Sequence, residues 1–473
     1  MANRALHVPR PRLLSPEQLD RIDESAARIL SEIGLRVRSE EALAASRRAG
    51  LRIDGDRVHP DRAAFDEFIA HTRAHQPPPD PDSDAEGDPE LVLTVCQYAT
   101  HRHDVDTDAI LPYTTETLIE AAKFVDTMAS RAVIGKAPGC PMDAPPDLQP
   151  LLQYKIGALY CRHGRGPVEI RSPRAMPYMM DMAEALGRPY LQQAVYVVSP
   201  LTIGGDSFDC ARAGRDRLES IWVSNMSSAG ATAPIRIADA LALAVAEVVG
   251  SAIVAREVTG LRAEWSVRVC PLDFQTLALS LGSPEELLFQ WAFEEVNAFY
   301  HGVEPRAQYG SIHTQAKLPG AQAAAEKMAL LLPGALLGAR TFTGAGRLSL
   351  DEVFSAEQLV IDCEMRDHVQ RLVSGLDTDC DPKACVAEVA AGLADGFLSL
   401  ESTAHTYRQV HWLPQLFERR ALSGWSAAGS PDLRRQAKGL VRRQLQLHDY
   451  ELEPDLRREV ERIYQQAERE LSG

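Results

Sequence analysis

The chain has 473 residues, of which 45% are hydrophobic and 25% are charged. These values are typical of a globular protein with a substantial core, and they exclude a disordered chain or a small disulfide-stapled domain. Its 50 basic and 66 acidic residues give a net charge of −16, which repels nucleic-acid phosphates and anionic lipid headgroups. We therefore expect neither nucleic acid nor a membrane among the partners.

The N-terminus and the cysteines indicate a cytoplasmic protein. Residues 1–14 carry positive charge but lack the apolar stretch of a secretory signal. The eight cysteines are scattered, and none forms a zinc-finger or CxxC pattern. We interpret the closest pair, Cys380 and Cys385, as two ordinary thiols near a helix start, with a metal or redox motif as the alternative. The most apolar stretch, 235–256, contains two acidic residues and is therefore expected to be a buried helix.

The first part of the chain is predicted to be helical. Ser15 and Pro16 are a typical N-cap and first helical residue, and apolar residues follow at helical spacing. Prolines and acids then dominate 76–90, which excludes a packed core and marks a linker. We expect residues 1–90 to form an N-terminal helical segment with an acidic, proline-rich linker.

Beyond the linker, short apolar runs alternate with longer helical patterns. The runs that favour strands are 132–137, 167–171, 193–198, 220–224, 262–269, 306–312 and 335–342. The patterns that favour helices are 147–161, 173–187, 208–218, 235–256, 283–299, 318–332 and 353–373. This order predicts an α/β fold with a parallel sheet. Since no glycine-rich phosphate loop is present, we expect residues 91–375 to form a (β/α)8 TIM barrel, with the eighth strand unplaced. A C-terminal helical region, 376–473, is expected to pack against the barrel or a partner.

No hydrolase, kinase or EF-hand signature is present, so the candidate residues follow from the fold. In a barrel, chemistry takes place at the C-terminal ends of the strands. The positions that this rule selects are Glu169, Arg171, Tyr196, Ser199, Asn225, Met226, Glu264, Trp265, Asp273, Phe274, Gln308, Tyr309, His313, Lys317, Arg340 and Phe342.

Tyr309, His313 and Lys317 form the densest polar group among these positions. They offer a phenol, an imidazole and an amine at one rim, although a hydrogen-bonded loop is the alternative. Glu264 and Trp265 are neighbours on one strand, so only one of them can point into the barrel.

Glu169 lies between two apolar neighbours, which predicts that it faces inward and needs a partner or a cationic ligand. A salt bridge to Arg171 is the alternative. His101 and His103 have the spacing of a metal pair on a strand, but we interpret them as solvated and expect no metal site.

Several segments together resemble one known family. They are LSPEQLDRIDESAARILSEIGLRV, SAGATAPIRIADALALA, GSPEELL, YGSIHTQAKLPGAQAAAEK, FSAEQLVIDCE and AHTYRQVHWLPQLFERR. In this order they resemble the trimethylamine methyltransferase (MttB-like) family of corrinoid-dependent methyltransferases, in its branch without pyrrolysine. The resemblance spans nearly the whole chain. It implies a barrel that passes a methyl group from a methylated amine to the cobalt(I) of a separate corrinoid protein.

The chemistry of the C–N bond narrows the expected substrate. Members that act on trimethylamine resemble one another in carrying pyrrolysine, whereas all 473 residues here are standard. A quaternary ammonium needs no such activation, because its nitrogen leaves as a neutral tertiary amine. We therefore expect a betaine-like quaternary amine. No cofactor is expected to be bound covalently, and a homo-oligomer is among the expected assemblies.

The candidate residues then receive roles. We expect Tyr309, Trp265 and Phe342 around the ammonium, Glu169 or Glu264 as its counter-charge, and His313, Lys317 or Arg171 on a substrate carboxylate. Two alternatives stay open. One is a non-catalytic barrel that binds a small methylated or zwitterionic molecule, and the other is a diverged, corrinoid-independent methyltransferase.

Overall fold

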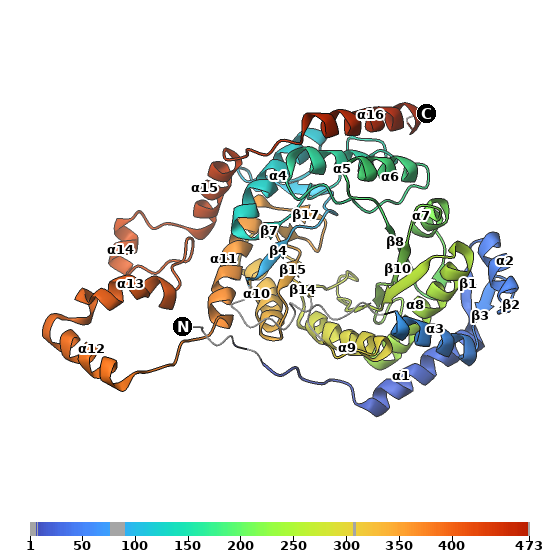
Figure 1. The fold of residues 1–473 in the computed structure, drawn as a ribbon, viewed down its shortest axis with the longest axis horizontal. Helices are drawn as coiled ribbons and strands as arrows, with labels where there is room; N and C mark the ends of the chain where they lie inside the picture. Colours follow the sequence, from blue (N-terminus) through green and yellow to red (C-terminus); the bar gives the residue numbers. More distant parts are fainter. Residues whose placement is uncertain (1–5, 7, 76–89, 306–308, 472–473) are drawn as a thin grey trace.

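The computed structural model describes the chain except for residues 1–5, 7, 76–89, 306–308 and 472–473. The central part alternates parallel strands with helices, which surround the strands (Figure 1). The mixed α/β architecture expected from the sequence is therefore present. Most of the expected linker, 76–90, lies outside the described residues.

One parallel sheet joins strands from the two ends of the alternating region. Its order is β14–β15–β4–β7, made of β14 (Tyr309–Ser311), β15 (Thr341–Thr343), β4 (Val92–Thr94) and β7 (Val133–Ile134). β4 was not among the strands expected from the sequence. It pairs in parallel with β15 on one side and with β7 on the other.

The second parallel sheet has the order β12–β10–β8. Its strands are β8 (Gln192–Tyr196), β10 (Ser220–Ser224) and β12 (Arg262–Ser266). Its buried and less buried residues alternate along β8 and β12, as expected for strands with one face against helices. We call the face packed on helices the outer face and the opposite one the inner face.

The two sheets are not joined by strand pairing within the described residues. Residues 167–171, expected as a strand, have no strand assignment and lie between β7 and β8. Hydrogen bonds still link this segment to both sides: Lys136 Nζ donates to the Pro167 carbonyl at 2.8 Å, and Gln193 Nε2 donates to the Ile170 carbonyl at 3.4 Å. A mixed α/β fold is thus established, whereas pairing around one closed cylinder is not.

Apart from the helix Thr115–Thr127, which was not expected from the sequence, the helices around the strands agree closely with the expected ranges. They are α4 (Thr115–Thr127), α5 (Gln149–Tyr160), α6 (Met176–Ala185), α7 (Asp206–Gly214), α8 (Ile237–Thr259), α9 (Pro284–His301), α10 (Ala321–Leu336) and α11 (Ala356–Val373). Among the described residues α8 alone is long and apolar enough to cross a membrane, but 78% of its most apolar window is buried inside the protein. It is therefore a core helix, as expected.

The N-terminal segment contains a small sheet as well as helices. Its elements are α1 (Pro16–Arg28), the π-helical turn Ile29–Ile33, β1 (Leu35–Val37), α2 (Glu40–Arg48), β2 (Arg52–Asp54), β3 (Arg57–His59) and α3 (Arg62–Ala74). Ser15 caps α1 in a capping box, as its position predicts. β1 also pairs with the distant β9 (Thr202–Ile203), which joins this segment to the central part.

Several short strands and turns complete the central part. They are β5 (His101–His103), β6 (Ile110–Pro112), the 3-10 turn Met128–Arg131, β11 (Ser227–Ser228), β13 (Val269–Cys270), β16 (Arg347–Leu348) and β17 (Val353–Phe354).

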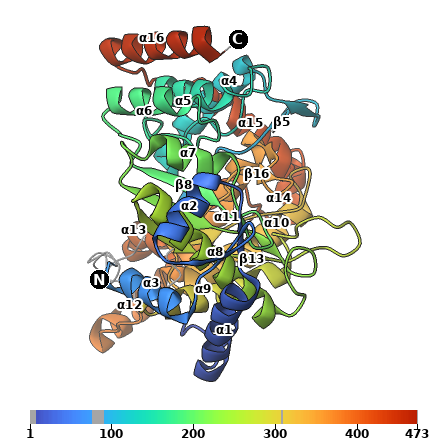
Figure 2. The ribbon, with the colours of Figure 1, turned by 90° about the vertical axis from the view of Figure 1, so that its right-hand side faces the viewer.

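The C-terminal region is helical, as expected, but only part of it packs on the body. It contains α12 (Pro382–Asp395), the 3-10 turn Phe397–Ser399, α13 (Glu401–Val410), α14 (Leu422–Ala427), α15 (Leu433–Leu445) and α16 (Pro454–Leu471). α16 lies along α5 and α6 (Figure 2). By contrast, α12 and α13 extend away from the body (Figure 1).

Candidate functional site

The register of the second sheet defines which side chains share the inner face. Tyr196 pairs with Ser224 and Ser224 with Ser266, so these three residues form one row. Trp222 and Glu264 belong to the next row. The inner face is therefore polar and aromatic, unlike the apolar outer face.

Glu169 is the centre of a polar cluster at the ends of the strands. Its carboxylate accepts hydrogen bonds from the hydroxyls of Tyr98 at 3.1 Å and Tyr196 at 3.0 Å. Arg171 Nε donates to the same carboxylate at 3.0 Å. We call Tyr98, Glu169, Arg171 and Tyr196 the Glu169 cluster. The salt bridge to Arg171, which was the alternative interpretation of Glu169, is present, and the carboxylate also contacts two phenols.

The surroundings keep both phenols protonated. Burial, together with the Glu169 carboxylate, raises the pKa of Tyr98 to about 12 and raises the pKa of Tyr196 further. Burial lowers the pKa of Arg171, but Glu169 together with Tyr196 and Tyr98 raises it, so the pKa lies above its ordinary value. The Glu169 carboxyl group is therefore surrounded by a guanidinium and by two phenols that keep their protons at neutral pH.

Aromatic rings in and beside the cluster already contact cations. The Arg171 guanidinium lies 5.8 Å from the ring centroid of Tyr196, and the Arg347 guanidinium lies 5.4 Å from that of Tyr98. Trp222 stands edge-on to Tyr196 at 6.3 Å between centroids. Since ring faces attract positive charge, this group of rings has the chemistry to hold an ammonium ion.

Trp265 and Phe342 lie on the outer face, which corrects their expected role in the cage. Trp265 is only 3% exposed, packs against Phe68 and Tyr300, and donates to Thr72 Oγ1 at 3.0 Å. Phe342 is fully buried between β14 and α10. Alternation along β12 turns Trp265 away from the face that carries Glu264 and Tyr196, and Phe342, on β15 of the other sheet, packs against α10.

Glu264 lies on the inner face but outside the Glu169 cluster. Its carboxylate pairs with Arg262 at 2.7 Å and accepts from Gln192 Nε2 at 2.9 Å. The structure thus places two inner-face carboxylates in separate groups, and only Glu169 is joined to tyrosine hydroxyls.

The three residues expected in one loop have different surroundings. His313 is buried, lies beside Ser311, and its Nε2 accepts from Arg347 at 3.2 Å. Burial and the charges of neighbouring arginines lower its pKa well below the ordinary value, so the ring is neutral. Lys317 is exposed and donates to Ser349 Oγ at 2.8 Å. Tyr309 is the first residue of β14, and its backbone pairs with Thr341 of β15. The side chain of Tyr309 lies outside the described residues.

Sequence reasoning missed Tyr98, Trp222 and Arg347. Tyr98 follows β4, which was not predicted, and Arg347 belongs to the short antiparallel strand β16. If a strand had been predicted at 92–94, the rule that chemistry lies at the C-terminal ends of barrel strands would have selected Tyr98 as well.

A second polar group, His103, Asp108 and Glu357, has donor atoms within 4.8 Å of one another. Its carboxylates, however, are paired with cations from α15: Arg434 contacts Glu357 and Asp108 at 2.6 Å each, and Lys438 contacts Asp108 at 2.9 Å. These cations take the place that a metal ion would need. The group therefore fixes α15 to the body.

Comparison with known families places the whole chain. Residues 3–471 match the family described as trimethylamine methyltransferase. The chain belongs to this family. The resemblance noted in the sequence is thereby confirmed over nearly its full length.

The relatives carry more than one substrate name. A trimethylamine methyltransferase of Methanosarcina barkeri (strain Fusaro) is 30% identical over 299 residues, which cover 63% of this chain and 59% of that protein. The chain thus spans little more than half the length of this relative. A glycine betaine methyltransferase of Desulfitobacterium hafniense (strain Y51) is 24% identical over 437 residues, 89% of each chain. A solved monomethylamine methyltransferase of M. barkeri covers 91% of this chain at 11% identity with a TM-score of 0.41.

Proposed function

We propose that this protein transfers a methyl group from a betaine-like quaternary amine to the cobalt(I) of a separate corrinoid protein, in a cytoplasmic setting. The family supports the reaction class, and the relative named for glycine betaine, matched over 89% of each chain, supports the substrate class. The observation that carries the proposal is the Glu169 cluster, where a carboxylate, aromatic rings and a guanidinium converge.

The ammonium end of the substrate is assigned to the rings and the carboxylate. Tyr98, Tyr196 and Trp222 offer aromatic surface, and Glu169 offers the counter-charge. A quaternary nitrogen has no N–H to donate, so it is bound by ring faces and by the nearby Glu169 carboxylate rather than by hydrogen bonds.

The carboxylate end is assigned to Arg171 rather than to His313 or Lys317. Arg171 uses Nε for Glu169, and its side chain is 65% exposed, so its other nitrogens can reach a ligand. His313 is neutral and engaged by Arg347, which gives it no charge for a carboxylate. Lys317 donates to Ser349, and it takes part in none of the hydrogen bonds described for the Glu169 cluster.

The placement of the cluster fits a barrel in which β4, β7, β8, β10, β12, β14 and β15 are completed by residues 167–171. Tyr196 is the last residue of β8, and Tyr98 follows β4, so both lie where a barrel enzyme places its chemistry. We include this closed arrangement in the proposal.

The reaction needs orientation more than proton transfer. The C–N bond breaks, its electron pair stays on nitrogen, and the methyl group moves to the corrinoid cobalt, whose electron pair forms the new bond. The corrinoid is a substrate brought by the partner protein and supplies the nucleophile. The chain's residues hold one N-methyl group outward and exclude water, which lowers the entropic part of the barrier.

The test is methyl transfer by the purified full chain to a cobalt(I) corrinoid protein, followed by the absorbance change on methylation. Glycine betaine, choline and trimethylamine are compared as donors. We expect glycine betaine to methylate the cobalt fastest. Failure with every quaternary amine would overturn the proposal; binding without turnover would favour a non-catalytic barrel, and turnover without corrinoid would favour the independent methyltransferase.

A matched pair of variants tests the site itself. Glu169→Gln removes the charge that the tyrosine hydroxyls and Arg171 surround, whereas Glu264→Gln removes the other inner-face carboxylate. We expect the first variant to lose most activity and the second to retain it. The reverse result would move the ammonium site to the row of Glu264.

A further inference from the structure

The segment from Leu376 to Val410, which contains α12 and α13 and is called the arm, contacts the body at its two ends, where Leu376 and Val410 lie beside the end of α11 and Arg371 donates to the Val410 carbonyl. Among the described residues, the recurrent contacts of α12 and α13 are with the short turn between them. All α12 side chains are exposed, and Gly392 alone is buried. A helix of 14 residues is marginal in water unless packing stabilises it. We therefore expect another protein surface to pack against the arm.

One side of the arm carries an apolar stripe. Val386, Val389 and Leu393 recur at helical spacing and are 71%, 44% and 77% exposed. Leu398, in the turn that follows, is 93% exposed. Exposed apolar residues in such a stripe indicate a protein contact rather than a solvated face.

The start of the arm is acidic. Asp377, Asp379 and Asp381 follow one another at every second residue, and the structure shows no ion pair for any of them within the part that it describes. The protein as a whole carries a net charge of −16, so most of its surface repels this segment.

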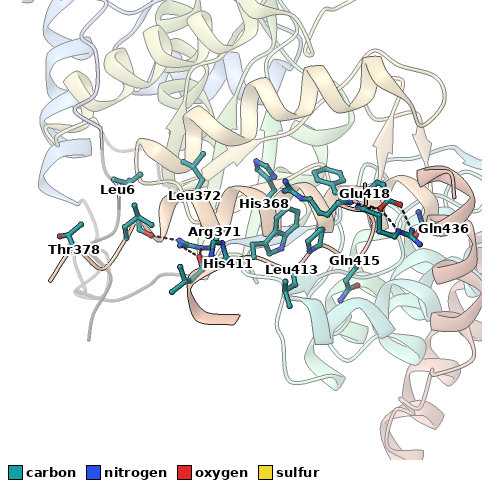
Figure 3. A pocket seen from close by; sticks show the side chains of 18 residues that line it. Leu6, His368, Arg371, Leu372, Thr378, His411, Leu413, Gln415, Glu418 and Gln436 are labelled. Carbon is teal, nitrogen blue, oxygen red and sulfur yellow. Dashed lines mark hydrogen bonds and ion pairs between the residues drawn. The ribbon is translucent and has the colours of Figure 1, made fainter. Parts of the chain in front are cut away.

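A groove of about 1700 Å³ lies at the base of the arm, between the end of α11 and residues 410–420 (Figure 3). Its lining combines apolar side chains, such as Leu372 and Leu413, with guanidinium groups and with the Glu418 carboxylate, which pairs with Arg420 at 2.7 Å. Arg371 donates to the carbonyls of Val410 and Gly375, and Arg419 lies 5.7 Å from the ring centroid of Trp412. Neither guanidinium is paired with a carboxylate among the described residues.

The charges of arm and groove are complementary, and within one copy only the ends of the arm, at Leu376, Thr378 and Val410, line the groove. Thr378, at the root of the arm, lies at one end of the groove and Glu418 at the other (Figure 3). The arm leads away from the groove, so its stripe stays exposed (Figure 1).

We propose that the arm of one copy lies in the groove of a second copy, and the reverse, in a two-fold symmetric dimer. This exchange covers both apolar stripes and places each acidic segment against the arginines of the other copy. A two-fold interface contains the same contact twice. Each chain has one arm and one groove, so both contacts can form in a dimer. The proposal is independent of the methyl transfer proposed above.

The experiment is sedimentation of the full chain over a wide range of concentrations. We expect the wild type to be a dimer and Val386→Asp with Leu393→Asp to weaken dimerisation by at least about tenfold, because two charges would enter an apolar contact. Leu447→Asp is the control, since Leu447 is 64% exposed between α15 and α16, outside the arm.

Charge exchange gives a second, independent measurement. Asp377→Lys with Asp379→Lys, or Arg419→Glu alone, should each weaken the dimer, and a chain with all three changes should recover most of the affinity. Melting curves show whether each variant is folded. A monomeric wild type, a dimer that the arm variants leave unchanged, or equal weakening by the control would overturn the proposal. A monomer whose arm variants lose the corrinoid protein would also overturn it and assign the arm to that partner.

Discussion

Replacing Arg171 with methionine should separate substrates with a carboxylate from those without one. Arg171 Nε is bound to Glu169, while its terminal amino groups are free to pair with a ligand. A hydrogen bond to a charged group contributes about 1.5–3 kcal/mol. Because the side chain is 65% exposed, water screens the interaction, and the lower end applies. We expect glycine betaine to bind about tenfold more weakly to Arg171→Met.

Choline should respond in the opposite direction. It carries the same ammonium group without the carboxylate, so it gains nothing from Arg171 and is repelled by it. Without Arg171, Glu169 keeps only the two tyrosine hydroxyls and becomes a stronger counter-charge. Calorimetric titration of both ligands measures the difference. Equal losses for glycine betaine and choline would refute the assignment of Arg171 to the carboxylate.

Three further predictions test the site and the core. Tyr196→Ala should weaken ammonium binding by about 1–2 kcal/mol, whereas Tyr196→Phe, which keeps the ring and loses only the hydroxyl on Glu169, should cost less in the same titration. Lys327→Met should lower the free energy of unfolding by about 3 kcal/mol in denaturant titrations, because it leaves the fully buried Asp362 without its cation at 2.7 Å; a compensating Asp362→Leu should recover much of this loss. Burial lowers the pKa of Lys136 to about 8. Between pH 8 and its ordinary pKa of about 10.4, the unfolded chain therefore binds more protons than the folded one, and the free energy of unfolding rises with pH. Denaturant titrations of Lys136→Met on both sides of pH 8 should lack this part of the rise.

The sequence pattern predicted the helices around the strands more completely than the strands. Helices such as α8 and α9 have long apolar periodicity and clear ends, so local sequence is sufficient. β4 has only three residues and directly follows the acidic stretch, which hid it. β1 is equally short and pairs with β9 far along the chain, a contact that no local pattern contains.

The candidate site could be predicted only where local sequence patterns determine it. Alternation along β12 showed that Glu264 and Trp265 point to opposite faces, but only packing against α3 and α9 decides which face holds the tryptophan. Glu169 and Arg171 were selected because they lie at the end of a segment expected to be a strand, and Glu169 also stands between apolar neighbours. Their contact with Tyr98 depends on the arrangement of distant strands, which the sequence alone does not give.

The pairing of β4 with β15 constrains how the protein is made. Val92 and Thr341 are partners in this ladder, although almost 250 residues separate them along the chain. During synthesis on the ribosome, β4 has an unsatisfied edge until β15 emerges. Non-local pairing of this kind slows folding and leaves a strand edge open to wrong partners in the meantime. We therefore expect the protein to depend on chaperones during translation more than a helical protein whose contacts are local.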